Sequence, residues 1–288
     1  MRRRQRYRDD RPPRVTNLGN LPPSQPRPFT RIDGAAARAD SGAVAEEVPV
    51  AFVYGGKPHV VMMCTPADID DLAVGFTLSE EIASGLGEIV RYYVVRHARG
   101  IEVQIELHPD AQARVAERTR ALAGRTGCGL CGIDAIDHAI REPRLVSTNV
   151  QFSAAAVARA GESLAANQPL NSETRAVHAA AWANEAGSLE IVREDVGRHN
   201  ALDKVIGALA RAGRDPSTGF FVVTSRASYE LVQKVAVTGS PLLAAVSRPT
   251  GLAIDFAEKA GVTLAGLVRG QGANVYTHFP RLVEDPRR

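Results

Sequence analysis

Between residues 48 and 107, apolar and polar positions alternate in short runs that are typical of β-strands. Two strand pairs are predicted, over 48–54 with 59–64 and over 89–95 with 101–107. The strict alternation from Ile101 to Leu107 indicates a strand with one face in water. We therefore predict a small α+β domain over residues 32–124.

A helix is predicted between the two strand pairs. Its apolar side would carry Leu72 and Phe76, which have helical spacing. Thr65 and Asp68 flank a proline in the pattern of a helix start, with Thr65 as the N-cap.

The second half of the chain alternates apolar strands with helices. A capped helix over 153–166 and a hairpin over 174–193 come first. Strands are then predicted at 219–224, 242–246 and 262–268, and helices at 200–210, 229–237 and 252–259. This order predicts a parallel sheet covered on both faces. The fold class is therefore α/β, with an α/β domain over 153–288 joined to the smaller N-terminal domain by a connection over 125–152.

Composition fits an ordinary globular chain of 288 residues, with 44% hydrophobic and 23% charged residues. No apolar run approaches the ~20 residues of a membrane span, and the arginine-rich start is not followed by the apolar core of a secretory signal. Three cysteines are too few, and odd in number, for a disulfide framework. We expect a cytoplasmic protein with no membrane contact.

Charge is concentrated at the N-terminus. Residues 1–31 contain nine arginines, two aspartates and six prolines, a composition that predicts a disordered tail. This tail carries a charge of about +7, so the rest of a chain with net charge +3 carries about −4. The globular part is therefore not expected to bind nucleic acid.

Three arginines follow three successive predicted strands. Arg226, Arg248 and Arg269 are 22 and 21 residues apart, so each falls at the same point of a strand–turn–helix unit. Ligands of open α/β sheets bind beyond the carboxyl ends of the strands, where guanidinium groups and helix N-termini suit phosphate. The alternative is that these arginines pair with carboxylates at the edge of the core, such as Asp195, Asp203 or Asp255.

A dense polar segment, Glu194-Asp195-Val196-Gly197-Arg198-His199-Asn200, joins a predicted strand to a predicted helix. It is expected on the same edge of the sheet as the three arginines. His199 beside two charged neighbours is a candidate functional residue, and the alternative is a capping role.

The densest candidate chemistry is the segment Thr126-Gly127-Cys128-Gly129-Leu130-Cys131-Gly132. Glycines around two thiols give a tight loop with accessible sulfur atoms. Isoleucines with helical spacing follow, so Cys131 is expected near a helix N-terminus, where the dipole favours a thiolate. Cys64, at the end of an apolar strand, is instead expected to be buried and structural.

Three other roles agree less well with this pair of thiols. A structural zinc site needs four ligands, and no companion pair is present, so we expect no resident metal. A thioredoxin-like centre would follow the first strand of a βαβ unit, and a zinc deaminase would carry a proline before the first cysteine. A nucleophilic or sulfur-carrying thiol agrees best with the pattern.

The chain resembles the formate dehydrogenase accessory protein (FdhD) family over about residues 47–278. The resemblance rests on four motifs: Cys-Gly-Leu-Cys-Gly at 128–132, Glu-Asp-Val-Gly-Arg-His-Asn-Ala-Leu-Asp-Lys at 194–204, Ser-Arg-Ala-Ser at 225–228, and Arg269-Gly270 followed by Asn-Val-Tyr-Thr at 274–277.

The resemblance implies a homodimeric sulfurtransferase whose C-terminal domain is similar to cytidine deaminases without their zinc. Cys128 and Cys131 would accept sulfur, as a persulfide, from a cysteine desulfurase. The sulfur would pass to the bis-molybdopterin guanine dinucleotide cofactor destined for formate dehydrogenase. Contacts to this cofactor are implied for Leu267, Val268, Arg269, Gly270, Gln271 and Gly272, together with the strand-end Arg226 and Arg248.

This sequence departs from the family at two of those positions. Leu267 replaces a common aromatic residue, and a further basic residue near Gly272 is missing. Two hypotheses of other classes remain open: a zinc-stabilised interaction module without chemistry, and a nucleotide-binding enzyme whose thiols are incidental.

Overall fold

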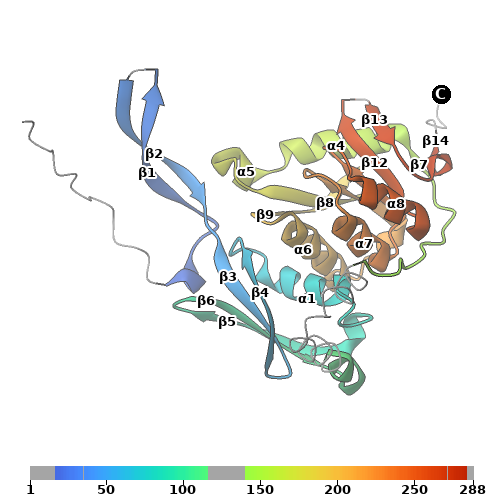
Figure 1. Ribbon diagram of the computed structural model, residues 1–288, viewed down its shortest axis with the longest axis horizontal. Coiled ribbons are helices and arrows are strands. Elements are labelled where there is room, and N and C mark those ends of the chain that lie inside the picture. Colours follow the sequence, from blue (N-terminus) through green and yellow to red (C-terminus); the bar gives the residue numbers. More distant parts are fainter. Residues whose placement is uncertain (1–16, 35, 116–139, 271, 284–288) are drawn as a thin grey trace, which may run out of the picture.

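The structure is a computed structural model that describes residues 17–34, 36–115, 140–270 and 272–283. A four-stranded sheet occupies the N-terminal half, a six-stranded sheet occupies the C-terminal half, and a two-stranded arm projects from the body (Figure 1). The predicted α/β class is confirmed. The likeness of the C-terminal domain to cytidine deaminases stays a prediction.

The N-terminal sheet has the order β4-β3-β6-β5 and confirms both predicted strand pairs. Its strands are β3 (Val48–Tyr54), β4 (Lys57–Cys64), β5 (Ile89–His97) and β6 (Gly100–Leu107). Helix α1 (Ile69–Ser79) packs its apolar side on one face of this sheet. The 3₁₀ turn η2 (Leu86–Glu88) precedes β5, and residues 109–115 are helical.

The C-terminal sheet has the order β13-β12-β11-β10-β8-β9. Its strands are β8 (His178–Asn184), β9 (Leu189–Asp195), β10 (Gly219–Val223), β11 (Leu242–Ala245), β12 (Thr263–Arg269) and β13 (Gly272–Val275). The three central strands β10, β11 and β12 are parallel, whereas β8 and β13 run antiparallel to their neighbours. The predicted parallel sheet is therefore the centre of a mixed one.

Helices cover both faces of this sheet, as the continuous apolar strands predicted. One face packs against α6 (Arg198–Arg211), α7 (Tyr229–Thr238) and α8 (Gly251–Ala260). The other packs against α4 (Ala154–Ala166), whose N-cap Ser153 accepts from the backbone N–H of Ala156 at 3.0 Å. The smaller elements are η1 (Leu18–Asn20), β7 (Phe152–Ser153), α5 (Pro169–Thr174), η3 (Pro216–Thr218), η4 (Phe279–Arg281) and β14 (Leu282–Val283).

Helices α1 and α6 join the two halves at a close crossing. Gly75 of α1 faces the backbone of Asp203, and Gly207 of α6 faces the backbone of Asp71. A Cβ atom at Gly207 would lie 1.9 Å from the carbonyl oxygen of Asp71. The absence of side chains at both positions therefore allows the two helix backbones to touch.

Gly207→Ala is expected to lower the free energy of unfolding by about 3 kcal/mol or more. The added methyl group would collide with the backbone of α1, which cannot move aside as a flexible side chain can. Chemical denaturation would measure the change. Gly251→Ala is the matched control, since Gly251 begins α8 and has no atom within 4 Å of an added Cβ. Equal stability of the two variants would contradict this account of the crossing.

The start of α1 differs from the prediction. The helix begins at Ile69 with Asp68 as its N-cap residue, and Thr65 does not cap it. The Thr65 backbone N–H instead donates to Asp195 at 3.0 Å, and its hydroxyl accepts from the Val196 N–H at 3.1 Å. The Thr65 groups that would have capped the helix thus form hydrogen bonds with the C-terminal half instead.

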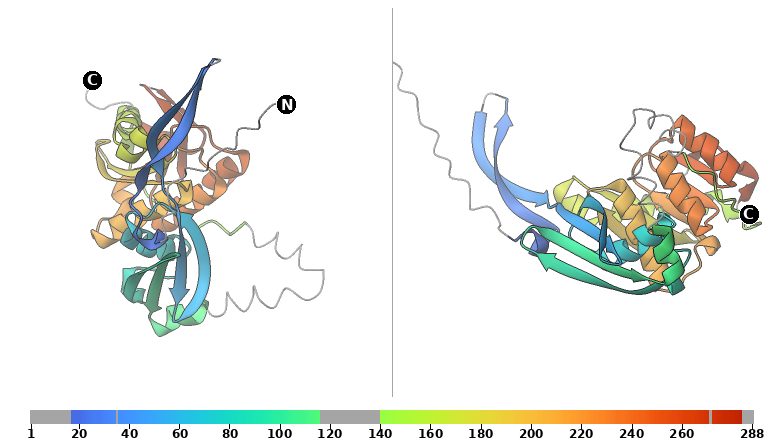
Figure 2. Two further views of the ribbon diagram at one scale, coloured as in Figure 1. Left: turned by 90° about the vertical axis from the view of Figure 1, so that its left-hand side faces the viewer. Right: turned by 60° about the horizontal axis from the view of Figure 1, so that its bottom comes forward.

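The expected disorder of residues 1–31 is wrong for the part that forms an arm, defined as β1 (Ser24–Asp33) and β2 (Ala36–Ala45). The two strands pair antiparallel over ten positions and extend away from the body (Figure 2). Pro26 and Pro28 are two residues apart in β1, so the N–H groups that they lack belong to one edge of the strand, and a two-stranded ribbon leaves one edge of each strand unpaired. The prolines that suggested disorder are therefore compatible with a strand.

The predicted cysteine loop at 126–132 lies outside the described residues, as do residues 1–16 of the predicted tail. In the ranges that the structure does describe, no helix is both long and apolar enough to cross a membrane.

Candidate functional site

Four strands of the C-terminal sheet end on one rim. Strand β8 is antiparallel to both β9 and β10, so β9 runs in the same direction as β10, β11 and β12. The carboxyl ends of β9, β10 and β11 lead into the N-termini of α6, α7 and α8. Three helix N-termini at one edge provide N–H donors and positive dipole ends for an anion.

The three strand-end arginines lie on this rim, as the sequence predicted. Arg226 and Arg248 follow β10 and β11, Arg269 ends β12, and all three side chains are exposed. Among the described residues, none of the three forms an ion pair. Asp195 and Asp203, offered as alternative partners, pair instead with Lys204 at 2.6 Å and with Lys234 at 2.9 Å. The guanidinium groups are therefore available to a ligand.

The polar segment 194–200 is held in place by buried contacts. Glu194 accepts from the backbone N–H groups of Leu170 and Asn171 at 2.9 and 2.8 Å. Asp195 is fully buried and accepts from the Gly197 N–H at 2.8 Å and from Asn200 Nδ2 at 3.0 Å. The loop that begins α6 is thus fixed before any ligand binds.

Lys204 completes this cluster from within α6. Its ammonium group pairs with Asp195 and donates to the carbonyl oxygens of Thr65 at 3.2 Å and Glu194 at 3.3 Å. Both charged side chains are fully buried. The ion pair therefore fastens the end of β4 and the end of β9 to the same helix.

Cys64 is buried beside this cluster, with Asn200 Nδ2 at 3.3 Å from its Sγ. Burial is the main reason that its thiol pKa lies far above the ordinary value, and the Asp195 charge adds to the effect. A thiol that stays protonated is a poor nucleophile. The predicted structural role of Cys64 is confirmed.

His199 lies on the first turn of α6 and faces the start of α7. Its Nε2 is 2.7 Å from a Glu230 carboxylate oxygen and 3.4 Å from Ser228 Oγ. Burial, with the Arg198 and Lys234 charges, lowers the pKa of His199 to about 4 against the opposite effect of Glu230. The imidazole is thus neutral at neutral pH and can donate Nε2–H to Glu230.

The positive charge of the rim also acts on His178, the first residue of β8. Its pKa is lowered mainly by burial and further by the charges of Arg198 and Arg226. Arg198 Nε is buried and has no hydrogen-bond partner among the described residues. An anion placed here would therefore meet donors that the protein itself leaves unused.

A polar cavity of about 320 Å³ opens between α1, α6 and α7 beside His199. Lys234 lies at its base, 2.9 Å from Asp203 and 2.8 Å from Glu80. Burial opposes ionisation of Glu80, but Lys234 and Arg141 outweigh it and lower the pKa of Glu80 to about 2. Arg141, the second residue described after the cysteine loop, pairs with Glu80 at 2.7 Å. The described chain thus resumes beside this cavity.

The segment implied to contact the cofactor has an irregular backbone. Leu267 has φ 52°, which is unusual for a residue with a side chain, and the β12–β13 register shifts between Gly266 and Arg269. Val268 is buried in the core, Arg269 is exposed, and Gly270 has φ 53°. Gly272 begins β13, and Gln271 lies outside the described residues. The positive φ of Leu267 and the register shift change the backbone direction just before Arg269.

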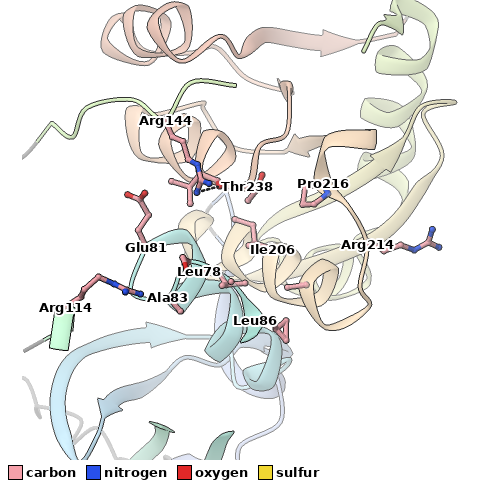
Figure 3. A pocket seen from close by; sticks show the side chains of 14 residues that line it. Leu78, Glu81, Ala83, Leu86, Arg114, Arg144, Ile206, Arg214, Pro216 and Thr238 are labelled. Carbon is pink, nitrogen blue, oxygen red and sulfur yellow. Dashed lines mark hydrogen bonds between the residues drawn. The ribbon is translucent and has the colours of Figure 1, made fainter. Parts of the chain in front are cut away.

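A larger cavity of about 550 Å³ lies at the opposite ends of α6 and α7 (Figure 3). Two of its three arginines already form ion pairs, Arg114 with Glu88 at 2.5 Å and Arg214 with Glu190 at 3.1 Å, while Arg144 donates to the carbonyl oxygen of Val237 at 3.5 Å. It also lies near helix C-termini, which repel anions. The rim is therefore the better candidate for binding a polyanion.

The structure places Arg226, Arg248, Arg269 and His199 on the same rim of the sheet, whereas Cys128 and Cys131 lie outside the described residues. The sequence analysis did not identify the roles of Lys204 and Lys234. The sequence did contain a signal for Lys204, which lies among Ala201, Val205 and Ala208 at the spacing of the buried side of α6. A charged residue on a buried helix face indicates an internal ion pair.

The sequence model of the FdhD/NarQ family matches residues 45–283. A sulfur carrier protein FdhD of Xanthomonas euvesicatoria is 48% identical over 261 residues, which cover 91% of this chain and 93% of that protein. A protein of the same name from Cupriavidus necator is 49% identical over 239 residues, or 83% of each chain.

Among solved structures, a crystal structure from Desulfotalea psychrophila, provisionally assigned as a formate dehydrogenase accessory protein, is similar to this chain. The TM-score is 0.70 at 22% identity, and the match covers 91% of this chain and all of the other. This likeness supports the fold.

Proposed function

Since the chain belongs to the FdhD/NarQ family, we propose that it is a sulfur carrier that acts in the maturation of formate dehydrogenase. Relatives at 48–49% identity are named as sulfur carriers, and this chain contains the Cys-Gly-Leu-Cys-Gly motif that could bear the sulfur. In the proposed loading step, the Cys128 thiolate attacks the terminal sulfur of a persulfide on a cysteine desulfurase. The new S–S bond forms on Cys128 as the desulfurase thiolate leaves, so no external oxidant is required.

The proposed receiver of the sulfur is the bis-molybdopterin guanine dinucleotide cofactor, bound as substrate at the rim. The observation that carries this assignment is the row of strand-end arginines without ion pairs among the described residues, beside three helix N-termini. A dinucleotide with pyrophosphate groups is a polyanion of matching chemistry. Leu267, Val268, Gly270, Gln271 and Gly272 would then contact the cofactor beside Arg269, as the resemblance implies.

The test is to incubate the protein with a cysteine desulfurase and cysteine, and to search by mass spectrometry for an added sulfur on the tryptic peptide 126–141. We expect the added sulfur only when the desulfurase is present. The peptide that contains Cys64 is an internal control, because a buried protonated thiol should stay unmodified. Loading of neither Cys128 nor Cys131 would contradict the sulfur-carrier role, and metal analysis of the same sample would test the zinc-module alternative.

Nucleotide binding gives an independent prediction. Arg269→Ala is expected to weaken binding of guanosine diphosphate by about 1.5–3 kcal/mol, roughly ten- to a hundredfold, because a charged hydrogen bond is lost. Titration calorimetry would measure it. Arg214→Ala is the control, since Arg214 is exposed and pairs with Glu190 at the far ends of the helices. Equal affinities for the two variants would contradict binding at the rim.

A further inference from the structure

The polar cavity between α1, α6 and α7 contains hydrogen-bonding groups that the described chain leaves unused. Gln233 of α7 lines it and is only 9% exposed, yet its side-chain amide forms no hydrogen bond with another described residue. The Tyr229 hydroxyl accepts from the backbone N–H of Arg141 at 2.7 Å, so its own hydrogen remains to donate. Buried polar groups are normally paired, so a ligand that pairs with these two groups is favoured.

His199 and Glu230 add two acceptors to the same cavity. The neutral imidazole donates Nε2–H to Glu230, which leaves Nδ1 as an acceptor without a partner among the described residues. Glu230 and Gln233 are three residues apart, so they lie on one face of α7. Glu230 is 58% exposed, so its carboxylate lies nearer to solvent than the amide of Gln233. The cavity thus offers acceptors beside an amide that both donates and accepts.

Two apolar side chains also line the cavity, Phe76 of α1 and Met62 of β4. Aromatic rings and thioethers pack favourably on flat rings, whereas carboxylates, amides and hydroxyls bind polar ring edges. Ligand sites typically combine apolar walls with a few placed polar groups. With a volume of about 320 Å³, the cavity therefore suits a small planar heterocycle.

The charge of the lining disfavours a phosphate group. The carboxylates of Glu80, Asp203 and Glu230 line the cavity with only two cations, Lys234 and Arg141. Both cations already pair with these carboxylates, Lys234 with Asp203 and Glu80, and Arg141 with Glu80. In the part of the chain that the structure describes, no group of three or more His, Cys, Asp or Glu residues could hold a metal ion. The favoured ligand is therefore a neutral ring rich in N–H donors, in contrast to the polyanion expected at the rim.

We propose that this cavity binds the pterin end of the substrate whose phosphates bind the rim, an inference that rests on the proposed function. A pterin presents a ring N–H, a 2-amino group and a 4-oxo group along one edge. The Glu230 carboxylate would accept from the two nitrogen donors, and the Gln233 amide would donate to the oxo group. His199 on the first turn of α6 and Ser228, the N-cap residue of α7, place the cavity beside the helix N-termini of the rim. One ligand can therefore reach both.

Guanine has the same donor and acceptor edge, so the position of the cavity decides between the two rings. In the proposed substrate the pterins carry the metal that receives the sulfur, and the guanines lie at the far ends. Arg141, which lines the cavity, follows Cys131 by ten residues, a span of at most ~36 Å. Arg269 ends β12, which is two strands from β10 and therefore ~10 Å farther along the rim. This order assigns the sulfur-receiving end to the cavity and the guanine ends to the side of Arg269.

The test measures binding of free pterin by the quenching of its fluorescence, with the full-length protein raised to millimolar concentration. Saturable binding is expected, at least tenfold tighter than that of lumazine, in which an oxo group replaces the 2-amino group. Gln233→Met should weaken pterin binding about tenfold or more. Gln104→Met is the matched control, because Gln104 is an exposed amide on β6. Glu230→Gln, at a largely exposed position, is a second variant with the same expected loss, and circular dichroism checks the fold of all three.

Guanosine diphosphate separates this inference from the proposed function. Arg269→Ala should weaken binding of the nucleotide and leave pterin binding unchanged, whereas Gln233→Met should do the reverse. The inference is overturned if pterin binding does not saturate, if lumazine binds equally well, or if Gln233→Met and Gln104→Met behave alike. It is also overturned if Gln233→Met weakens nucleotide binding as much as pterin binding, since guanine would then occupy the cavity. Persulfide loading and nucleotide binding at the rim test the proposed function, and neither depends on pterin binding.

Discussion

Cys128→Ala is expected to abolish persulfide loading completely, whereas Cys131→Ala should still accept sulfur and deliver it poorly. Because glycines flank Cys128 on both sides in the sequence, we expect its sulfur to be the more accessible of the two. An unperturbed thiol with a pKa near ~8.5 is mostly protonated at neutral pH, so the loop has to favour the thiolate. Arg125 and the expected helix N-terminus after Cys131 supply positive potential for this purpose.

The two thiols also suggest how the carried sulfur would be released. Attack of the Cys131 thiolate on the Cys128 sulfur would close a disulfide and expel hydrosulfide, so the dithiol provides the two electrons that reduce the carried sulfur. Mass spectrometry of peptide 126–141 after loading measures which cysteine carries sulfur in each variant. Normal loading of Cys128→Ala would reverse the assignment. Unchanged activation of formate dehydrogenase by both variants would contradict the carrier role itself.

Lys204→Met is expected to lower the free energy of unfolding by about 3–5 kcal/mol, because it leaves the Asp195 carboxylate buried without its counter-ion. The same change removes the ammonium group that donates to the carbonyl oxygens of Thr65 and Glu194. Denaturation with urea would measure the loss.

The double variant Asp195→Asn/Lys204→Met is the matched comparison. It removes both charges, so it should be more stable than Lys204→Met alone. If the single and double variants were equally destabilised, the cost would come from lost packing and not from the unpaired charge.

Much of the fold could be predicted because its signals are local. The spacing of apolar residues located α6, α7 and α8, and one repeated strand–helix unit placed Arg226, Arg248 and Arg269 on a common edge. This regularity also predicted that the segment 194–200 and His199 belong to the same rim.

The features that the sequence analysis missed depend on residues far apart in the chain. Thr65 has the sequence of a helix cap, yet its bonds go to a segment about 130 residues away. The arm was missed because proline and arginine content suggests disorder, whereas only the pairing register shows that the prolines share an edge and the charges share a face. The mixed sheet was missed because the sequence predicted β8 only as part of a hairpin, and no local signal shows that β8 pairs with β10 or that β13 pairs with β12.

The contact between α1 and the C-terminal half has a consequence for synthesis of the protein. Ser79 accepts from Lys234, which lies 155 residues later, and the buried Asp71 pairs with Arg193 at 2.7 Å and with Arg211. A ribosome adds ~5–20 residues per second, so roughly 8–30 s separate the emergence of Ser79 from that of its partner. During this interval the C-terminal half that packs on α1 has not been synthesised. The side of α1 that it will bury, with both apolar and charged residues, is therefore exposed. The first half of the chain is therefore expected to depend on chaperones on the ribosome until translation has passed residue 234.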